Sequence, residues 1–310
     1  MTQLGGYTIE LFEKDHCSPI SDDHNYSCLD DKLIMKIAEK VNKMIKKDKN
    51  NDYEEIDLDA SITDIHNEIS KILKKMTGCS SEVCWLSFKK LMSLLGEHKT
   101  HFEQSFKPFM PDKWLNDYNT WLRTDDIEKC LGQYQEKNND FYFYGAVPID
   151  FDNCSVSHLC DINLKDHLRN GIGKIGIVFN TDPHDESGEH WISFYTDIHG
   201  KNLNGIPGIY YYDSYGNKPP NEVEKLISKL KRQGEKINKK FKYFYNDTAH
   251  QKENYQCGMY CIHFIKEMIK GTNFQNFVNR KLTDDLMLNK RKEYFISPRE
   301  LKYNNNNNDG

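Results

Sequence analysis

Residues 250–270 read HQKENYQCGMYCIHFIKEMIK, and this stretch decides how the rest of the chain is interpreted. Its apolar residues recur at helical spacing after a polar loop, at Met259, Ile262, Ile265 and Met268 or Ile269. Cys257 would therefore open a helix, where outward-pointing backbone N–H groups favour a thiolate. Gly258 has no side chain, so a substrate backbone could approach the thiol closely. The pattern predicts a nucleophilic cysteine at a helix N-terminus.

Upstream of this stretch, runs of aromatic and β-branched residues alternate with helical patterns. The predicted strands are FYFYGAVPI (141–149), KIGIVFN (174–180), WISFYTD (191–197), GIYYYD (208–213) and FKYFY (241–245). Helical spacing covers residues 221–242 and 258–270. The mixture predicts the α+β class.

The first hundred residues have a different, lysine-rich texture. Helices are predicted at 32–47, at 62–73 with a stop at Gly78, and at 82–95. Pro108 and Pro111 interrupt helical continuity. We therefore expect a helical N-terminal arm over 1–110, a catalytic domain over 111–296, and a low-complexity, disordered tail over 297–310 to which no function is assigned.

Composition excludes several classes of protein. The 310 residues include 42 Lys and Arg against 47 Asp and Glu, a net charge of -5, which excludes a uniformly basic nucleic-acid binder. No leader pattern and no apolar run of roughly 18 residues is present, so an intracellular, soluble protein without a membrane partner is expected. The nine cysteines, spread over a long chain, predict mostly reduced thiols.

A thiol nucleophile needs a base, and the best-placed histidine precedes a predicted strand. His190 comes directly before the run 191–197, and Asp213 ends the run 208–213. Asp213 could accept the Nδ1 proton of His190 and leave Nε2 facing the thiol of Cys257. The order His, Asp, Cys, with Gln251 six positions before the cysteine, is far more specific than any one of these residues.

Three strings carry a resemblance to a known family. GEHWISFY (188–195), YYYDSYG (210–216) and HQKENYQCGMYC (250–261) resemble the Ulp/SENP deSUMOylases and the adenovirus-type, or adenain-like, cysteine proteases, including those of large cytoplasmic DNA viruses. The resemblance covers about residues 112–290. It implies a mixed central sheet flanked by helices, and the N-terminal arm matches the layout of the large-virus enzymes.

The same resemblance implies a role for each matching residue. Cys257 would be the nucleophile, His190 the base, Asp213 its orienting partner, and Gln251 a side-chain donor of the oxyanion hole, beside the backbone N–H of Cys257. Preorganised donors of this kind are worth roughly 3 to 4 kcal/mol each in a dry site. Some viral relatives carry Asn or Glu where this chain has Asp213, so that position follows the Ulp and SENP pattern.

Substrate contacts follow from the same family pattern. Trp191 resembles a tryptophan that walls a narrow channel over the glycines of the substrate, next to Gly258. A core aromatic is the alternative interpretation of Trp191. For the second wall we favour Trp121 over Trp114, because Trp121 leads into an acid-capped helix and then the strand at 141–149.

The expected function is therefore that of a cysteine endopeptidase cutting at Gly-Gly sites. Its polypeptide substrates would be viral capsid or core polyproteins, in the host cytoplasm and the virion. An isopeptidase acting on a ubiquitin-like modifier is the first alternative. A catalytically dead binding relative is the second, disfavoured because all four catalytic side chains are present. The segment QLGGY (3–7) suggests self-cleavage near the N-terminus.

Other signals have a simpler explanation. Cys79 and Cys84 are spaced CxxxxC, yet structural zinc sites usually use CxxC pairs, so buried cysteines at a helix start are favoured and no metal or cofactor is expected. Cys261 could be a resolving thiol, although a small core residue is preferred. The basic run 225–242 could bind nucleic acid, but such a run is usually the solvated face of an amphipathic helix.

Overall fold

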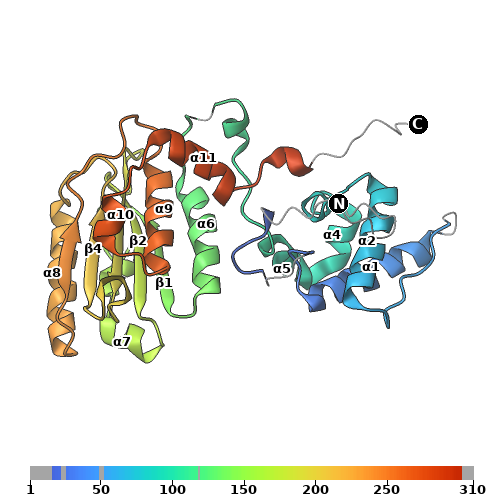
Figure 1. Cartoon of the computed structure of the whole chain (residues 1–310), viewed down its shortest axis with the longest axis horizontal. Helices are drawn as coiled ribbons and strands as arrows, with labels where there is room; N and C mark the ends of the chain where they lie inside the picture. The colour runs from blue at the N-terminus through green and yellow to red at the C-terminus, as the bar shows by residue number, and fades with distance from the viewer. Residues whose placement is uncertain (1–15, 22–25, 49–51, 118, 302–310) are drawn as a thin grey trace, which may run out of the picture. The chain divides into compact units, whose positions relative to one another are not determined.

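The computed structural model describes residues 16–21, 26–48, 52–117 and 119–301 and divides the chain into two compact units (Figure 1). One unit comprises the residues up to Phe109 together with those from Phe295 onward, and the other comprises Met110–Tyr294. All residues expected to carry the chemistry belong to the second unit.

The second unit is built on a five-stranded mixed sheet. The strands are β1 (Phe141–Val147), β2 (Lys174–Asn180), β3 (Trp191–Asp197), β4 (Gly208–Tyr212) and β5 (Lys242–Tyr245), in that spatial order. The outer pairs β1–β2 and β4–β5 are parallel, and the inner pairs β2–β3 and β3–β4 are antiparallel. Because β3 and β4 are antiparallel, the start of β3 lies beside the end of β4.

Helices cover both faces of this sheet (Figure 1). They are α6 (Thr124–Lys137), α7 (Leu164–Arg169), α8 (Asn221–Lys236), α9 (Cys257–Ile269), α10 (Phe274–Val278) and α11 (Asp284–Tyr294). α7 and α8 pack on one face, where Leu164, Val223 and Leu230 share a core with Ile177 and Phe194. On the other face, Ile265 of α9 approaches Gly176 of β2. Short 3₁₀ helices complete the unit at Asp112–Leu115, His158–Asp161 and Lys201–Leu203.

The basic run at 225–242 lies on α8 and on the segment that follows it. The apolar residues of α8 are buried against the sheet, and most of its lysines and its arginine are exposed or half-buried. The helix ends at Lys236, where the chain turns through Asn238 with a positive φ of 57°. The run is therefore the outer face of an amphipathic helix and the segment after it, which is the preferred interpretation of its sequence, and nucleic-acid binding stays an untested alternative.

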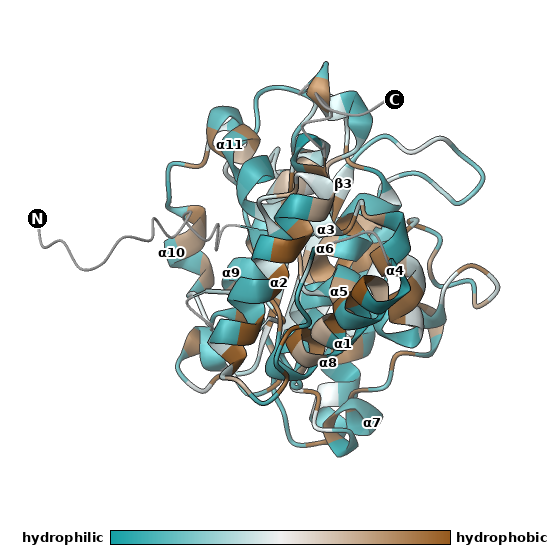
Figure 2. Ribbon diagram, turned by 90° about the vertical axis from the view of Figure 1, so that its right-hand side faces the viewer, coloured by the Kyte–Doolittle hydropathy of each residue, from teal (hydrophilic) through white to brown (hydrophobic). Residues whose placement is uncertain are grey.

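The first unit is helical. Its elements are α1 (Asp31–Lys47), α2 (Ile62–Thr77), α3 (Glu82–Trp85), α4 (Lys89–Leu95), α5 (Lys99–Gln104) and the 3₁₀ helices Gly96–His98 and Pro298–Leu301. Hydrophobic and hydrophilic residues alternate around α1 and α2 (Figure 2), as an amphipathic pattern requires. Gly78 ends α2 in the left-handed conformation, with φ of 76°.

Two sequence expectations need correction in this unit. The helix expected over 82–95 is broken into α3 and α4, because the Ser87 hydroxyl donates to the carbonyl of Cys84, 2.7 Å away, and the backbone tightens into i to i−3 bonds. In the expected tail, Pro298–Leu301 is a 3₁₀ helix and Leu301 packs on the core of this unit. Residues 302–310, and the segment QLGGY at 3–7, lie outside the described residues.

The cysteines also differ from expectation. Six of the nine form disulfides, Cys17–Cys28, Cys79–Cys84 and Cys154–Cys160. The prediction of mostly reduced thiols is therefore wrong for this structure, because the fold brings the Cα atoms of each pair to within 5.0–5.5 Å of each other. Cys130, Cys257 and Cys261 are free. In the part of the chain that the structure describes, no helix is both long and apolar enough to cross a membrane.

Candidate active site

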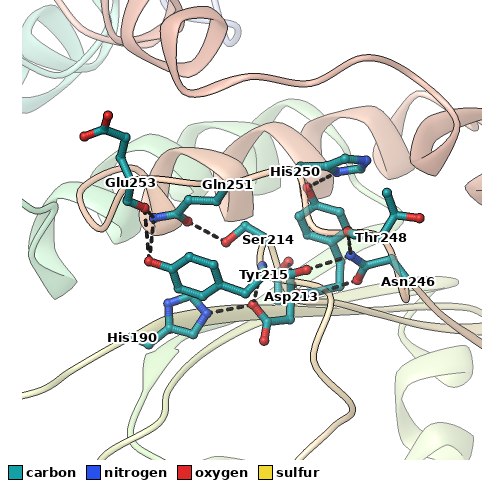
Figure 3. A network of polar contacts seen from close by, with 11 residues as sticks. His190, Asp213, Ser214, Tyr215, Asn246, Thr248, His250, Gln251 and Glu253 are labelled. Atoms are coloured by element: carbon teal, nitrogen blue, oxygen red, sulfur yellow. Dashed lines mark hydrogen bonds and ion pairs between the residues drawn. The ribbon is translucent and has the colours of Figure 1, made fainter.

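The start of β3 and the end of β4 bring together a histidine and an aspartate. His190 directly precedes β3 and Asp213 directly follows β4. The Nε2 atom of His190 lies 2.7 Å from Oδ1 of Asp213 (Figure 3). The antiparallel register of the two strands thus accounts for a pair that is separated by 23 positions in the sequence.

This geometry corrects one detail of the sequence prediction. We expected Asp213 to bond Nδ1 of His190, but the carboxylate is bonded to Nε2. Nε2 is the ring nitrogen further from the backbone, and it spans the distance to the end of the neighbouring strand. Nδ1 is consequently the ring nitrogen that remains for the thiol, so the roles of the two ring nitrogens are the reverse of those expected.

Asp213 is held in place by a dense set of hydrogen bonds. Its backbone N–H donates to Oδ1 of Asn246 at 2.9 Å, and Nδ2 of Asn246 donates to the carbonyl of Asp213 at 2.6 Å. The backbone N–H of Tyr215 donates to Oδ1 of Asp213 at 2.9 Å. Asp213 is 2% exposed. The carboxylate therefore has one orientation, and it fixes the plane of the imidazole.

Cys257 is the first residue of α9, as the sequence predicted, and it is buried. Burial alone lowers the pKa of His190, but hydrogen bonds to Asp213 and to Cys257 outweigh it and raise the pKa to about 9. His190 is therefore an imidazolium at neutral pH. A positive ring in hydrogen-bond contact with a thiol at a helix N-terminus is the environment in which a cysteine acts as a nucleophile.

Gln251 lies on the loop between β5 and α9. The backbone N–H groups of His250 and Gln251 donate to the carbonyl of Ser214 at 2.8 and 2.9 Å, which joins this loop to the turn after β4. The hydroxyl of Ser214 donates to Oε1 of Gln251 at 2.6 Å (Figure 3). Nε2 of Gln251 donates to the carbonyl of Glu253 and lies 3.3 Å from the hydroxyl of Tyr215. The amide is thus oriented with its nitrogen, the donor, away from Ser214.

The predicted substrate-contacting residues are brought together in part. A Cβ added at Gly258 would lie 3.0 Å from Cβ of Leu122 and 3.4 Å from Cδ1 of Trp191, so the space beside Cys257 is narrow. Trp191 is buried, and its indole N–H donates to the carbonyl of Leu122 at 2.9 Å. Trp121, next to Leu122, is 37% exposed.

Trp114, the other candidate for a channel wall, has a different environment. Its side chain is fully buried, and the guanidinium of Arg291 lies 4.3 Å from its ring centroid. A fully covered ring cannot contact a substrate without a rearrangement, so Trp121 remains the proposed second wall.

Several residues of this site were missed by sequence reasoning. Tyr215 lies with its ring 4.9 Å from that of His190, Asn246 and Ser214 orient the aspartate and the glutamine, and Arg291 contacts the residues before Cys257. Tyr215 and Ser214 stand in the quoted string YYYDSYG and could have been found from their closeness to Asp213. Nothing in the local sequence distinguishes Asn246 or Arg291.

Cys261, one helical turn after Cys257, was weighed as a resolving thiol. It is fully buried, and burial raises the pKa of its thiol well above the ordinary value. A thiol of this kind is a poor nucleophile, in keeping with the preferred interpretation as a core residue.

The chain was compared with known proteins and solved structures. The family described as "Ulp1 protease family, C-terminal catalytic domain" matches residues 129–301. A protein of Acanthamoeba polyphaga mimivirus that is named a thiol protease is 30% identical over 283 residues, which cover 88% of this chain and 90% of that protein. A SUMO-1 cysteine protease of African swine fever virus is 24% identical over 251 residues, 74% of this chain and 89% of that protein.

A solved structure has the same fold. The crystal structure of a protease of African swine fever virus superimposes with a TM-score of 0.62 at 19% identity, covering 91% of this chain and 98% of that chain. This similarity confirms the predicted fold class, an α+β Ulp-like core, and the matching family and relatives confirm the predicted enzyme class, a cysteine protease. The chain belongs to the Ulp1 protease family, and its relatives include thiol proteases of large DNA viruses.

Proposed function

We propose that the chain is an endopeptidase that cuts polypeptides at Gly-Gly sites, with Cys257 as nucleophile and His190 as general acid and base. The observation that carries the proposal is the hydrogen-bonded series Cys257, His190 and Asp213, in which the pKa of His190 is raised to about 9. Asp213 keeps the ring oriented and stabilises its positive charge.

The first half of the reaction forms a thioester. The thiolate of Cys257 attacks the scissile carbonyl, a C–S bond forms, and the carbonyl electron pair moves onto the oxygen. The backbone N–H of Cys257 and the Nε2 amide of Gln251 then stabilise the oxyanion. The Nδ1 proton of His190 passes to the amine as the C–N bond breaks.

The second half regenerates the enzyme. His190, now neutral, takes a proton from a water molecule whose oxygen attacks the thioester. The C–S bond breaks, the carboxylic acid product leaves, and Cys257 and His190 are again a thiolate and an imidazolium. The proton balance closes with one water consumed for each bond cut.

The narrow space beside Cys257 supports glycine at the cleavage site. Trp191 is buried, and its indole N–H donates to the carbonyl of Leu122. Leu122 and Trp191 both lie close to Gly258, so the space beside this glycine is wide enough only for a substrate backbone. A substrate side chain would have to displace these groups, whereas glycine would not. We assign Trp191 and Trp121 to the two walls of the substrate channel.

Viral structural polyproteins are the proposed substrates, in the host cytoplasm and the virion. The support is that the relatives are proteins of large DNA viruses. The test is to incubate the protein with polyprotein junctions containing Gly-Gly, and with the same junctions carrying Ala-Ala, and to map the cuts by mass spectrometry. Turnover of the Gly-Gly junctions alone is expected, and equal turnover of both sets would contradict the specificity.

An isopeptidase acting on a ubiquitin-like modifier is the second candidate. The name of the African swine fever virus relative, SUMO-1 cysteine protease, favours it. The chemistry of the site would be identical. A folded modifier conjugated to a lysine, placed in the same assay, separates the two: faster release of the modifier than cleavage of the unfolded junctions would favour the isopeptidase.

A further inference from the structure

A buried arginine lies against the segment that leads into Cys257. Arg291 belongs to α11 and has an exposed fraction of 0%. Its guanidinium is stacked on the indole of Trp114, 4.3 Å from the ring centroid. Burial of an arginine is costly unless its donors are used, so its hydrogen-bond partners indicate why it is there.

Two of its partners are the residues immediately before the nucleophile. Nε of Arg291 donates to Oε1 of Gln256 at 3.1 Å, and Nη2 lies 3.4 Å from the carbonyl of Tyr255. Nη2 also donates to the carbonyl of Thr120 at 2.8 Å. Gln256 is the N-cap of α9, and Cys257 follows it. One planar group therefore bridges the segment at 120 and the start of the catalytic helix.

The charge of Arg291 is not neutralised by direct contact. Among the described residues no carboxylate forms an ion pair with it, and Nη1 has no hydrogen-bond partner. Burial lowers the pKa of Arg291 to about 10, while Asp117, Asp126 and Cys257 raise it, so the group stays positive at neutral pH.

We propose that Arg291 is a positioning residue of the protease site, which fixes the backbone before Cys257 through its hydrogen bonds to Gln256 and Tyr255 and so holds the nucleophile in place. The proposal rests on the assignment of Cys257 as nucleophile. It differs from a purely structural role because it requires the reactivity of the thiol, and not only stability, to depend on Arg291.

The thiolate is also influenced by other groups, which the test must hold constant. Among the described residues, the titratable groups that interact electrostatically with Cys257 or Arg291 include His190, Tyr215, Cys261, Asp117 and Asp126. All of them are unchanged in variants at position 291.

The experiment compares Arg291→Met, Arg291→Lys and a control, Lys292→Met, which removes an exposed positive charge from the same helix. The rate of iodoacetamide alkylation of Cys257 is followed against pH by peptide mass spectrometry, and kcat and KM are measured on a cleaved peptide. Arg291→Met is expected to change the alkylation profile of Cys257 and to lower kcat about tenfold or more, with KM within about twofold.

Arg291→Lys separates charge from geometry. Lysine keeps the charge but cannot serve several acceptors with one planar group, so kcat should still fall in this variant. Lys292→Met should match the unmodified protein in both measurements. Unfolding of each variant is monitored by circular dichroism.

Three outcomes decide the matter. Arg291→Met that folds and keeps both the alkylation profile and kcat would overturn the proposal. If Arg291→Met does not fold, an unchanged kcat in Arg291→Lys would overturn the positioning role. Cleavage by Cys257→Ala would instead refute the assignment of Cys257 as nucleophile. This result differs from a failure of the proposal for Arg291, because it does not depend on the variants at position 291.

Discussion

The indole nitrogen of Trp191 lies 2.9 Å from the carbonyl oxygen of Leu122, and the side chains of both residues border Gly258. This hydrogen bond joins the start of β3 to the segment just before α6. Gly258, the residue after Cys257, lies beside both segments. The hydrogen bond and the missing Cβ together set how wide the proposed substrate channel can be.

The first prediction concerns this width. Trp191→Ala should accept Ala in place of one substrate Gly but lose overall rate, because a wider channel no longer holds the carbonyl about 3 Å from the sulfur. Gly258→Ala should act in the opposite direction and lower kcat/KM even for Gly-Gly, since its Cβ would press on Leu122 at 3.0 Å. A peptide series varied at each glycine measures both effects, with Trp121→Ala as a second wall variant.

An unchanged preference in Trp191→Ala would contradict the channel. The relevant comparison is the ratio of kcat/KM for Gly-Gly and Ala-Ala peptides, because a general loss of activity changes both values equally.

The second prediction concerns the three reacting and orienting residues. Cys257→Ala and His190→Ala should abolish cleavage and leave the fold intact, because thiolate and imidazolium act as a unit. Asp213→Ala should be milder, since the aspartate orients the base without taking part in bond changes. Cleavage assays alongside thermal unfolding check both statements, and near-full activity of either of the first two variants would refute the assignment.

The strands and the start of α9 could be predicted from sequence because they follow from local patterns. Runs of aromatic and β-branched residues located all five strands, and a polar loop followed by apolar helical spacing located the start of α9 at Cys257. His190 directly precedes β3 and Asp213 directly follows β4. Antiparallel pairing of these two strands is therefore enough to bring the two side chains together.

What depends on tertiary structure could not be predicted in this way. Arg291 stands in the run NKRKEY, where any of the basic residues would be expected in solvent, and only the packing of Trp114 against α11 buries it. Which ring nitrogen of His190 bonds to Asp213 depends on the distance between the start of β3 and the end of β4. Likewise, the spacing of Cys79 and Cys84 in the sequence does not distinguish a reduced pair of zinc ligands from the disulfide that joins them.

The third prediction concerns pH. The pKa of His190 is raised to about 9 from an ordinary value of 6.5, so the imidazolium is lost only as pH rises through about 9. The pH profile of kcat/KM should therefore have its alkaline limb near 9. Asp213→Asn removes the negative charge beside the ring that helps to raise this pKa, so the alkaline limb of the variant should move to lower pH. A limb that stays in place in the variant would contradict the origin of the shift.

The same shift has a consequence for stability. A group whose folded pKa is raised stabilises the fold fully below its unfolded pKa of about 6.5 and loses that contribution as pH rises through about 9. The difference in unfolding free energy between the unmodified protein and His190→Gln should accordingly shrink between these two values. Urea denaturation at several pH values measures it, and a difference that grew with pH would have the wrong sign.

The fourth prediction distinguishes a donor to the oxyanion from the residue that orients it. Gln251→Ala should lower kcat about 100-fold with little change in KM, because its amide contacts charge that exists only in the transition state. Ser214→Ala leaves that amide in place but removes the 2.6 Å bond that fixes its oxygen, so the fall in kcat should be smaller. Before it can serve the oxyanion, Nε2 of Gln251 must also give up a contact with Glu253 or Tyr215. Tyr215→Phe removes one of these competing acceptors and keeps the ring beside His190, which makes it the matched control. A loss in Gln251→Ala that appeared wholly in KM would assign the glutamine to substrate binding in place of catalysis.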